Sequence, residues 1–203
     1  MSKIAWEIYD AASTEFFNMY ESLPFEQVHE GLLGFLPEFG AMCLDVGAGS
    51  GRDAAALADR GYNVVAVEPS NGLRRLAQER HGNARIKWLT DSLPNLVMLK
   101  SSAYRFDFVL LSAVWMHVHP EERLPSLQNL RGLLTAHGRI ALTLRLGAPN
   151  AERVIYPLTT EEVLNDAAAV GLTLLHVSKK ETDSLGRGDV RWQKIVLARS
   201  VET

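Results

Sequence analysis

The sequence contains few of the features that mark secreted, membrane or disulfide-bonded proteins. Its 203 residues include one cysteine, Cys43, so no internal disulfide can form. The apolar run around this thiol predicts a small buried hydrophobe in a chain suited to a reducing compartment. No apolar run is long enough to span a bilayer, and the first seven residues lack the apolar core of a signal peptide. We therefore expect a cytoplasmic protein without a membrane partner.

Two further absences concern charge and metal ligands. Lys and Arg number 21 against 24 Asp and Glu, a formal net charge of −3, so the chain has no excess of positive charge for nucleic acid. Clusters of His, Cys and acidic residues at metal-ligand spacing are missing, because His117 and His119 alone are too few to hold an ion. Neither nucleic acid nor a metal is expected as a partner. The remaining composition, 47% hydrophobic and 22% charged, is that of one globular domain.

What the sequence does contain is a glycine-rich bend between a predicted strand and a predicted helix. The apolar run 41–44 is typical of a buried strand, and the alanine-rich residues 53–60 are typical of a helix. Between them Gly47, Gly49 and Gly51 stand at alternate positions. Glycine there tolerates backbone angles that other residues resist and lets a ligand approach the chain, while the helix directs unpaired N–H groups at the bend. The alternative is a tight turn that binds nothing.

An acidic residue follows the next predicted strand. Residues 63–67 form a second apolar run that ends in Glu68. This acid falls about 20 residues beyond the first glycine, the spacing at which an acid meets ribose hydroxyls in dinucleotide-binding folds. A carboxylate can accept hydrogen bonds from both hydroxyls of one ribose. Alone, Glu68 would be interpreted as a solvated acid at a strand end, but with the glycine bend it predicts a nucleoside site.

The spacing of the glycines distinguishes between nucleosides. A nicotinamide or flavin site has a small residue at the position that Arg52 holds here. The sequence instead reads acid-x-Gly-x-Gly-x-Gly from Asp45 to Gly51, which resembles the first motif of class I S-adenosylmethionine-dependent methyltransferases. Residues 64–70 resemble the second motif, and the likeness extends over about residues 43–145 and loosely to the C-terminus. It implies S-adenosylmethionine as the cofactor, with S-adenosylhomocysteine as its product.

The resemblance also implies which residues contact this cofactor. The glycine bend would pack against its methionine part, and Glu68 would bind its ribose. After the third strand the family places an acid or polar group beside the adenine, here Asp91, although capping the next turn is a competing use. The full set expected at the cofactor is Asp45, Gly47, Ala48, Gly49, Gly51, Arg52, Glu68, Pro69, Ser70, Asp91, Ser92, Leu93, Ser112, Ala113 and, from the N-terminal segment, Tyr9 and Tyr20.

Apolar periodicity predicts alternating strands and helices along the rest of the chain. The last two strands are separated by residues 179–190, too short for a helical crossover, so they should pair antiparallel. We therefore predict an α/β fold with a Rossmann-like seven-stranded, mostly parallel sheet in the order 3-2-1-4-5-7-6, strand 7 antiparallel, and helices on both faces. The further strands are expected at 85–89, 106–111, 138–144, 172–177 and 191–198, and the further helices at 71–80, 121–136 and 160–170.

Two helical segments precede the first strand. Apolar residues recur at helical intervals over residues 4–20, and a second helix is expected within residues 24–37. In similar methyltransferases such an extension covers the cofactor, and the two tyrosines named above are the expected lid contacts. Ordinary packing against the domain would use the same residues. We predict a single domain with an N-terminal helical cap, residues 1–38, and a cofactor-binding core, residues 39–203.

The acceptor would bind beyond the carboxyl ends of the strands, where open α/β sheets hold their ligands. Candidates on this substrate side are Trp115, His117 and Arg145, and the arginine could meet an acceptor carboxylate or phosphate. His117 is the candidate general base, because its ordinary pKa suits proton transfer near neutral pH. A histidine beside an aromatic residue is, however, often a packing or capping group. Orientation alone can also supply most of the acceleration.

The sequence thus predicts an S-adenosylmethionine-dependent methyltransferase that moves a methyl group to a small-molecule acceptor by in-line displacement. The Asn/Asp-Pro-Pro-aromatic signature of amino-group methylation on DNA bases is absent after the fourth strand, where residues 112–115 read Ser-Ala-Val-Trp. The alternatives are an NAD(P)-binding oxidoreductase and a catalytically silent nucleoside-binding module. Either a monomer or a homodimer is expected.

Overall fold

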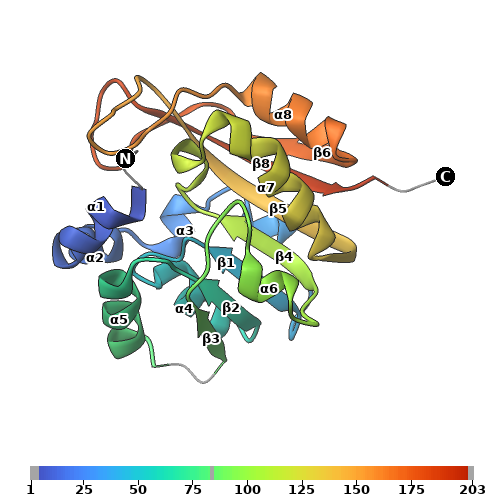
Figure 1. Cartoon of the computed structure of the whole chain (residues 1–203), viewed down its shortest axis with the longest axis horizontal. Helices are drawn as coiled ribbons and strands as arrows, with labels where there is room; N and C mark the ends of the chain where they lie inside the picture. The colour runs from blue at the N-terminus through green and yellow to red at the C-terminus, as the bar shows by residue number, and fades with distance from the viewer. Residues whose placement is uncertain (1–4, 83–84, 201–203) are drawn as a thin grey trace.

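A single sheet runs through the middle of the molecule (Figure 1). The computed structural model describes residues 5–82 and 85–200. Over these residues the strands are β1 (Met42–Val46), β2 (Asn63–Val67), β3 (Ile86–Leu89), β4 (Phe106–Leu111), β5 (Leu134–Leu146), β6 (Leu172–Val177), β7 (Glu181–Thr182) and β8 (Arg191–Arg199). Their order is β3-β2-β1-β4-β5-β8-β6, with β7 pairing β8. Strands β1 to β5 are parallel to one another, and β8 is antiparallel to β5 and β6.

This topology confirms the predicted Rossmann-like sheet and its reversed last strand. The one difference in strand number is β7, a short strand inside the connection between the last two long strands, which makes eight strands over the described residues where seven were predicted. Because β7 adds to the end of β8, it leaves the order of the main strands unchanged.

Helices cover both faces of the sheet (Figure 1). The helices α3 (Phe25–Val28) and α4 (Arg52–Asp59) pack against one face, and α6 (Val97–Lys100), α7 (Pro120–Gly132) and α8 (Thr160–Ala169) cover the other. Alternate residues of each strand point to opposite faces of the sheet. In β1, Cys43 packs in the core on the α4 side and Leu44 packs in the core on the α7 side. Burial on both faces explains why these strands are continuous apolar runs.

The N-terminal cap is more broken than predicted. One helix was expected over residues 4–20, but the structure has α1 (Ala5–Ala11) and α2 (Ser13–Glu21), and Ile4 lies outside the described residues. The break coincides with a docking contact on α5 (Asn71–Arg80): Asp10 Oδ1 accepts hydrogen bonds from Gly72 N and Ser70 Oγ, both at 2.7 Å. Figure 1 shows α1 and α2 beside α5 at one end of the sheet.

Other elements also differ from the predictions, among them β5, which spans Leu134–Leu146 where residues 138–144 were expected. The second cap helix shrinks to α3 and the 3-10 turn η1 (Leu33–Phe35), because Gly31 between them is left-handed at φ +84°. Helix α7 ends at Gly132 rather than residue 136, since Leu134 already pairs with Phe106 in the sheet. Helix α6 was not predicted. Among the described residues, no helix has the length and apolar character needed to cross a membrane.

Candidate functional site

The glycine bend closes over the end of β2. Gly47, Gly49 and Gly51 all have positive φ, at +67°, +56° and +82°, a conformation that glycine adopts without penalty. The N–H groups of Gly47 and Ala48 donate to Val67 O at 2.8 and 2.9 Å, which fixes the bend against the neighbouring strand. At Gly47 an added Cβ would lie 2.7 Å from a Val114 methyl group. Both the backbone angle and the close approach therefore require glycine there.

Glu68 lies at the end of β2 and faces this bend. Its side chain is buried, and its two oxygens accept hydrogen bonds from Gly49 N and Ser70 N, each at 2.8 Å. Burial raises the pKa of Glu68 to about 7, although the two backbone N–H groups act in the opposite direction. Among the described residues no Lys or Arg forms an ion pair with it. The carboxylate keeps free lone pairs for a further donor.

A cavity of about 740 Å³ opens above the bend, at the carboxyl ends of the parallel strands. This volume is in the range of ligand sites, about 300–1,000 Å³. Of the residues expected at the cofactor, the bend and β2 contribute Gly47, Ala48, Gly49, Arg52, Glu68 and Pro69 to its lining. The segments after β3 and β4 contribute Asp91, Ser92, Leu93, Ser112 and Ala113, and the cap contributes Tyr9 and Tyr20.

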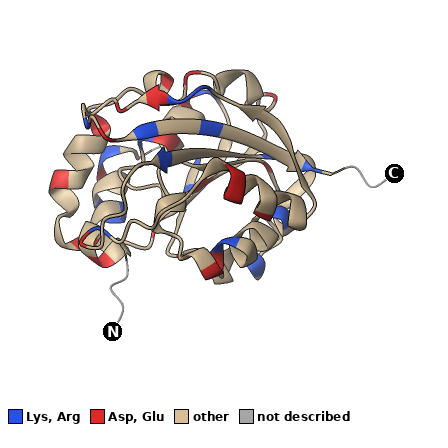
Figure 2. Ribbon diagram, turned by 90° about the horizontal axis from the view of Figure 1, so that it is seen from above, with Lys and Arg blue, Asp and Glu red and all other residues tan. Residues whose placement is uncertain are grey.

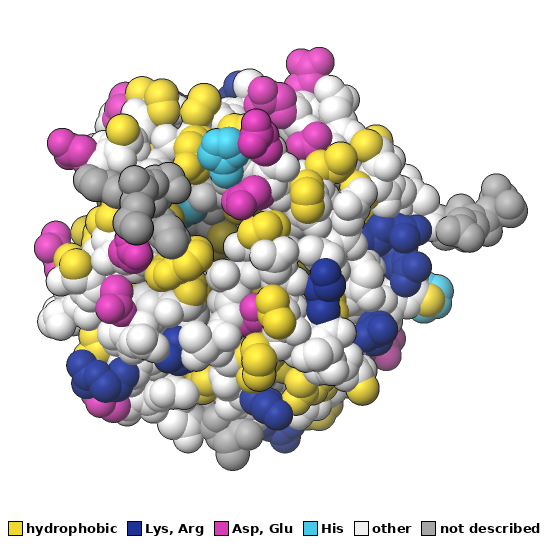
Figure 3. Space-filling model, viewed as in Figure 1, with side chains coloured by type: hydrophobic (Ala, Val, Ile, Leu, Met, Phe, Trp, Pro, Cys, Tyr) yellow, Lys and Arg dark blue, Asp and Glu magenta, His cyan; other side chains and the backbone are white. Residues whose placement is uncertain are grey.

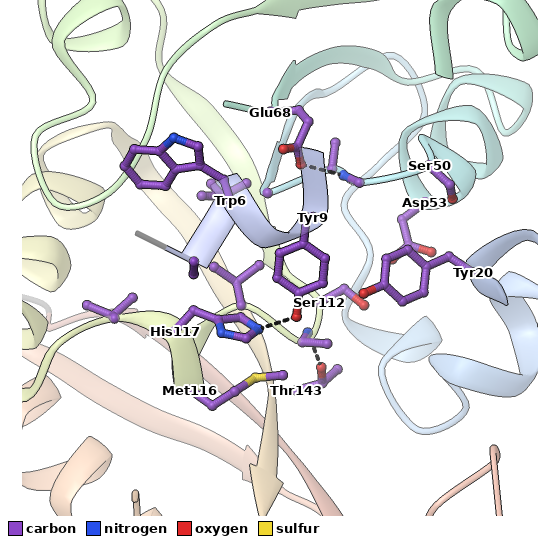
Figure 4. A pocket seen from close by; sticks show the side chains of 18 of the residues that line it. Trp6, Tyr9, Tyr20, Ser50, Asp53, Glu68, Ser112, Met116, His117 and Thr143 are labelled. Carbon is purple, nitrogen blue, oxygen red and sulfur yellow. Dashed lines mark hydrogen bonds between the residues drawn. The ribbon is translucent and has the colours of Figure 1, made fainter. Parts of the chain in front are cut away.

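Tyr20 supports the expectation that the cap acts as a lid. A Cβ added at Gly49 would lie 3.5 Å from the Tyr20 ring, so the ring stands directly over the bend. Figure 4 shows Tyr9 and Tyr20 entering the cavity from different helices of the cap, opposite Ser112 and Thr143. The cap therefore lines the cavity as well as packing against the domain.

Three expected cofactor contacts lie elsewhere, and the prediction is corrected for them. Asp45 is buried behind the bend, where burial and the Asp53 carboxylate raise its pKa. Gly51 faces β3 and α5 instead: an added Cβ would lie 2.8 Å from the Trp88 ring and 3.1 Å from Ala77 Cβ. Ser70 caps α5 by accepting from Leu73 N at 3.2 Å. These residues shape the bend from outside the cavity.

Two of the three substrate candidates are corrected as well. Trp115 is fully buried in the core, because the 3-10 turn η2 (Trp115–His117) points it inward and directs His117 to the cavity. Arg145 does not line the cavity, and its Nη1 donates to Ala148 O at 3.0 Å. Arg153, a few residues later, lines the cavity in its place.

Asp91 adopts the capping role that competes with adenine binding. Its carboxylate accepts three backbone hydrogen bonds, from Ser92 N at 3.0 Å, Met98 N at 2.8 Å and Leu99 N at 3.1 Å, and the last two hold the first turn of α6. A carboxylate has about four lone-pair sites. One therefore stays available, and Asp91 lines the cavity.

His117 is hydrogen-bonded on both ring nitrogens. Its Nδ1 lies 2.9 Å from Val154 O, a group that only accepts, so Nδ1 carries the proton. Its Nε2 then accepts from the Tyr9 hydroxyl at 2.8 Å (Figure 4). Burial lowers the pKa of His117 to about 4, and the nearby charge of Arg153 acts in the same direction. The imidazole is thus neutral at pH 7, and both it and Tyr9 line the cavity.

An ionic cluster at the start of α4 was not predicted. Asp53 accepts from Arg52 at 2.7 Å and from His29 Nε2 at 2.9 Å, and Arg52 Nη1 reaches Tyr20 O at 3.2 Å. Burial alone would raise the pKa of Asp53, but the charges and hydrogen bonds of its two partners outweigh burial and lower it. No local spacing signals this cluster, since its members lie on three separate elements.

The far end of the cavity carries two further ion pairs. Asp183 accepts from Arg187 Nη2 at 2.6 Å and from Trp192 Nε1 at 2.7 Å, and Lys194 bonds Glu181 at 2.7 Å. Over the described residues no group of three or more His, Cys, Asp or Glu side chains is arranged to hold a metal ion.

Comparison with known proteins adds independent findings. Residues 44–142 match the family model described as a methyltransferase domain. Over 120 residues the chain is 37% identical to an uncharacterized methyltransferase of Mycobacterium tuberculosis, a match that covers 56% of this chain and 56% of that protein. The chain thus spans about half the length of the curated relatives it matches.

Solved structures resemble the whole chain more fully. The TehB-like SAM-dependent methyltransferase of Corynebacterium glutamicum superposes with a TM-score of 0.70 at 20% identity, over 94% of this chain and 99% of that one. Magnesium protoporphyrin IX methyltransferase of Synechocystis, with bound SAH, superposes with a TM-score of 0.66 at 16% identity, over 86% of this chain and 81% of that one. At these identities the likeness concerns the fold.

Proposed function

We propose that this chain, a class I S-adenosylmethionine-dependent methyltransferase by its domain match and its fold, transfers a methyl group to a small-molecule acceptor. The observation that carries the proposal is the Glu68 carboxylate, which is buried, faces the cavity and has no basic side chain paired with it among the described residues. A buried carboxylate needs hydrogen-bond donors. Two backbone N–H groups occupy only part of its lone pairs, and the two hydroxyls of a ribose would supply further donors.

The residues around the cavity fit S-adenosylmethionine along its length. Glu68 would hold the ribose, and the backbone of Gly47 and Gly49, which carries no side chain, would lie against the methionine part. Ser92 and Leu93 would border the adenine, with the remaining lone pair of Asp91 available to its amino group. When bound, this cofactor supplies a methyl group already activated on a sulfonium. The NAD(P) alternative lacks any comparable support from the domain match.

The chain would contribute orientation and the exclusion of water. The cap covers the cavity with Tyr9 and Tyr20, so an acceptor would be held out of bulk solvent. Holding the acceptor in line and close to the methyl group can supply several kcal/mol of the barrier reduction, of the order of 7 for a well-oriented pair. Where the acceptor must lose a proton, Tyr9 would take it at its oxygen while passing its own proton to His117 Nε2.

A small-molecule acceptor suits both the closed cap and the charge distribution. Over the described residues, basic and acidic residues are interspersed along the ribbon in the view of Figure 2, without a basic stripe of the kind that follows a nucleic acid backbone. On the face seen in Figure 3, hydrophobic side chains lie in small groups among polar ones, without one large patch. A cytoplasmic location suits the single buried thiol of Cys43, and a monomer or a homodimer is compatible with the single domain.

Calorimetric titration with S-adenosylhomocysteine tests the proposal. The wild type should bind it, and Glu68→Gln should weaken binding by about 1–3 kcal/mol, the contribution of hydrogen bonds to a charged group. Glu79→Gln, an exposed change on α5, serves as the matched control and should bind as the wild type does. No heat with the wild type at high micromolar ligand would contradict the proposal. Transfer of labelled methyl to any small acceptor then separates an enzyme from a silent nucleoside-binding module.

A further inference from the structure

One basic side chain in the cavity has no acidic partner. Four basic residues line the cavity within the described part of the chain, and three of them are paired: Arg52 with Asp53, Arg187 with Asp183, and Lys194 with Glu181. The fourth, Arg153, forms no ion pair with a described residue. Its Nε is buried without a hydrogen-bond partner.

The side chains in contact with Arg153 are a tyrosine and a phenylalanine, and neither is acidic. Its Nη2 lies 3.5 Å from the Tyr9 hydroxyl, and its guanidinium stands 5.4 Å from the centre of the Phe16 ring. The ring stacks weakly with a cation, and the hydroxyl contact is long for a hydrogen bond. Neither neighbour neutralises the charge. The Arg153 side chain is half-buried, with its Nε inside, so a bound anion would stabilise its partly desolvated charge while its guanidinium stays accessible.

The segment that carries Arg153 is held in a strained conformation. Val154 has φ +51°, which is rare and costly for a β-branched residue. The strain is held from both sides: Asn150 and Ile155 exchange backbone hydrogen bonds of 3.0 and 2.8 Å, and Val154 O accepts from His117. Arg153 N also donates to Asn150 Oδ1 at 2.9 Å. These contacts fix the backbone of Arg153 at the cavity and keep its side chain beside Tyr9.

We propose that the methyl acceptor is a small oxyanion-bearing molecule whose carboxylate or phosphate group binds the guanidinium of Arg153 beside Tyr9. The inference rests on the proposed methyltransferase function and specifies its substrate class. Arginine presents parallel N–H groups that match both oxyanions, and such charge-assisted pairs are strong. The three remaining cations are already neutralised, so Arg153 is the group at which a net negative charge would be stabilised.

An anion at this position would also affect His117. The charge of Arg153 disfavours protonation of the imidazole, in addition to the larger effect of burial. An oxyanion bound to Arg153 would offset that charge and raise the proton affinity of His117 Nε2. The Tyr9–His117 pair would therefore accept a proton more readily when the acceptor is bound than when the cavity is empty.

The variants Arg153→Gln and Arg153→Lys test this inference against Arg75→Gln, which removes an exposed arginine on α5. Each protein is saturated with S-adenosylhomocysteine, and its melting temperature is followed as sodium phosphate or sodium acetate replaces chloride at constant ionic strength. We expect wild type and Arg75→Gln to be stabilised by at least one of the two anions. Arg153→Gln should bind that anion about tenfold or more weakly, and Arg153→Lys should fall between them. Equal shifts in all variants, or no shift in the wild type, overturn the inference.

A second arm distinguishes the acceptor from the carboxylate of the cofactor itself. S-adenosylhomocysteine and 5′-methylthioadenosine, which lacks the amino-acid part, are titrated into wild type and Arg153→Gln. Unchanged S-adenosylhomocysteine affinity in the variant supports an acceptor site and shows that the variant is folded. A loss confined to S-adenosylhomocysteine means that Arg153 holds the cofactor carboxylate, and the inference falls while the proposed function stands. Absence of binding to the wild type removes both.

Discussion

Two carboxylates at the site are both buried, yet their pKa values shift in opposite directions. Asp53 receives hydrogen bonds from His29 and Arg52, which lower its pKa despite burial. Glu68 receives only backbone N–H groups, and burial raises its pKa to about 7. The partner, rather than burial alone, decides which carboxylate stays ionised. Asp53 therefore suits a structural role, whereas Glu68 is available for a ligand that brings its own donors.

The raised pKa of Glu68 predicts a pH dependence of cofactor binding. A ribose needs the ionised carboxylate as acceptor, and with a pKa of about 7 this form becomes the minor one below neutrality. The affinity for S-adenosylhomocysteine should fall about tenfold from pH 8 to pH 6. Calorimetry across this range measures the change, with Glu68→Gln as a control that should show no such slope. A wild-type affinity that is flat, or that rises toward pH 6, contradicts the assigned role.

At the scale of single residues, the sequence predicts the placement of those site residues whose positions depend on local spacing. The positions of Gly47, Gly49 and Glu68 follow from a strand, a bend and the next strand, and the cavity includes all three. Trp115 was misassigned because nothing in the sequence shows that a 3-10 turn points it inward. Arg153 was missed because its approach depends on the left-handed Val154, which no propensity predicts.

At the scale of elements, the cap is tied to the core through Asp53. This side chain links His29, at the end of α3, with Arg52 of α4, and Arg52 reaches back to Tyr20 O on α2. One carboxylate thus connects two cap helices to the helix that follows the glycine bend. The break between α1 and α2 and the short α6 escaped prediction for a related reason: each coincides with a side-chain carboxylate, Asp10 or Asp91, that accepts a backbone hydrogen bond from another segment.

Asp53→Asn should loosen this connection. Removing the charge leaves Arg52 and His29 without their anion in a buried place, so the free energy of unfolding should fall by about 3 kcal/mol. Urea denaturation followed by circular dichroism measures the loss. Glu79→Gln, which breaks an exposed ion pair with Arg75, should change stability by about 0.5 kcal/mol or less. Equal stability of the two variants would mean that Asp53 does not anchor the cap.

For the whole molecule, the order of the sheet brings distant residues to one edge. Strands β1, β2 and β4 end side by side, so the glycine bend, Glu68 and the segment of Ser112 surround one cavity although they span much of the chain. The alternation of strands and helices made this arrangement predictable, since parallel strands end at the same edge. How the cap closes over that edge was not predictable in detail, because it depends on contacts between separate elements.

A crystal structure of the complex with S-adenosylhomocysteine tests the central claim most directly. The account predicts that the ligand lies along residues 47–49 under Tyr20, with both ribose hydroxyls within hydrogen-bonding distance of the Glu68 carboxylate. Ligand density away from this bend, or a ribose that does not contact Glu68, would contradict it.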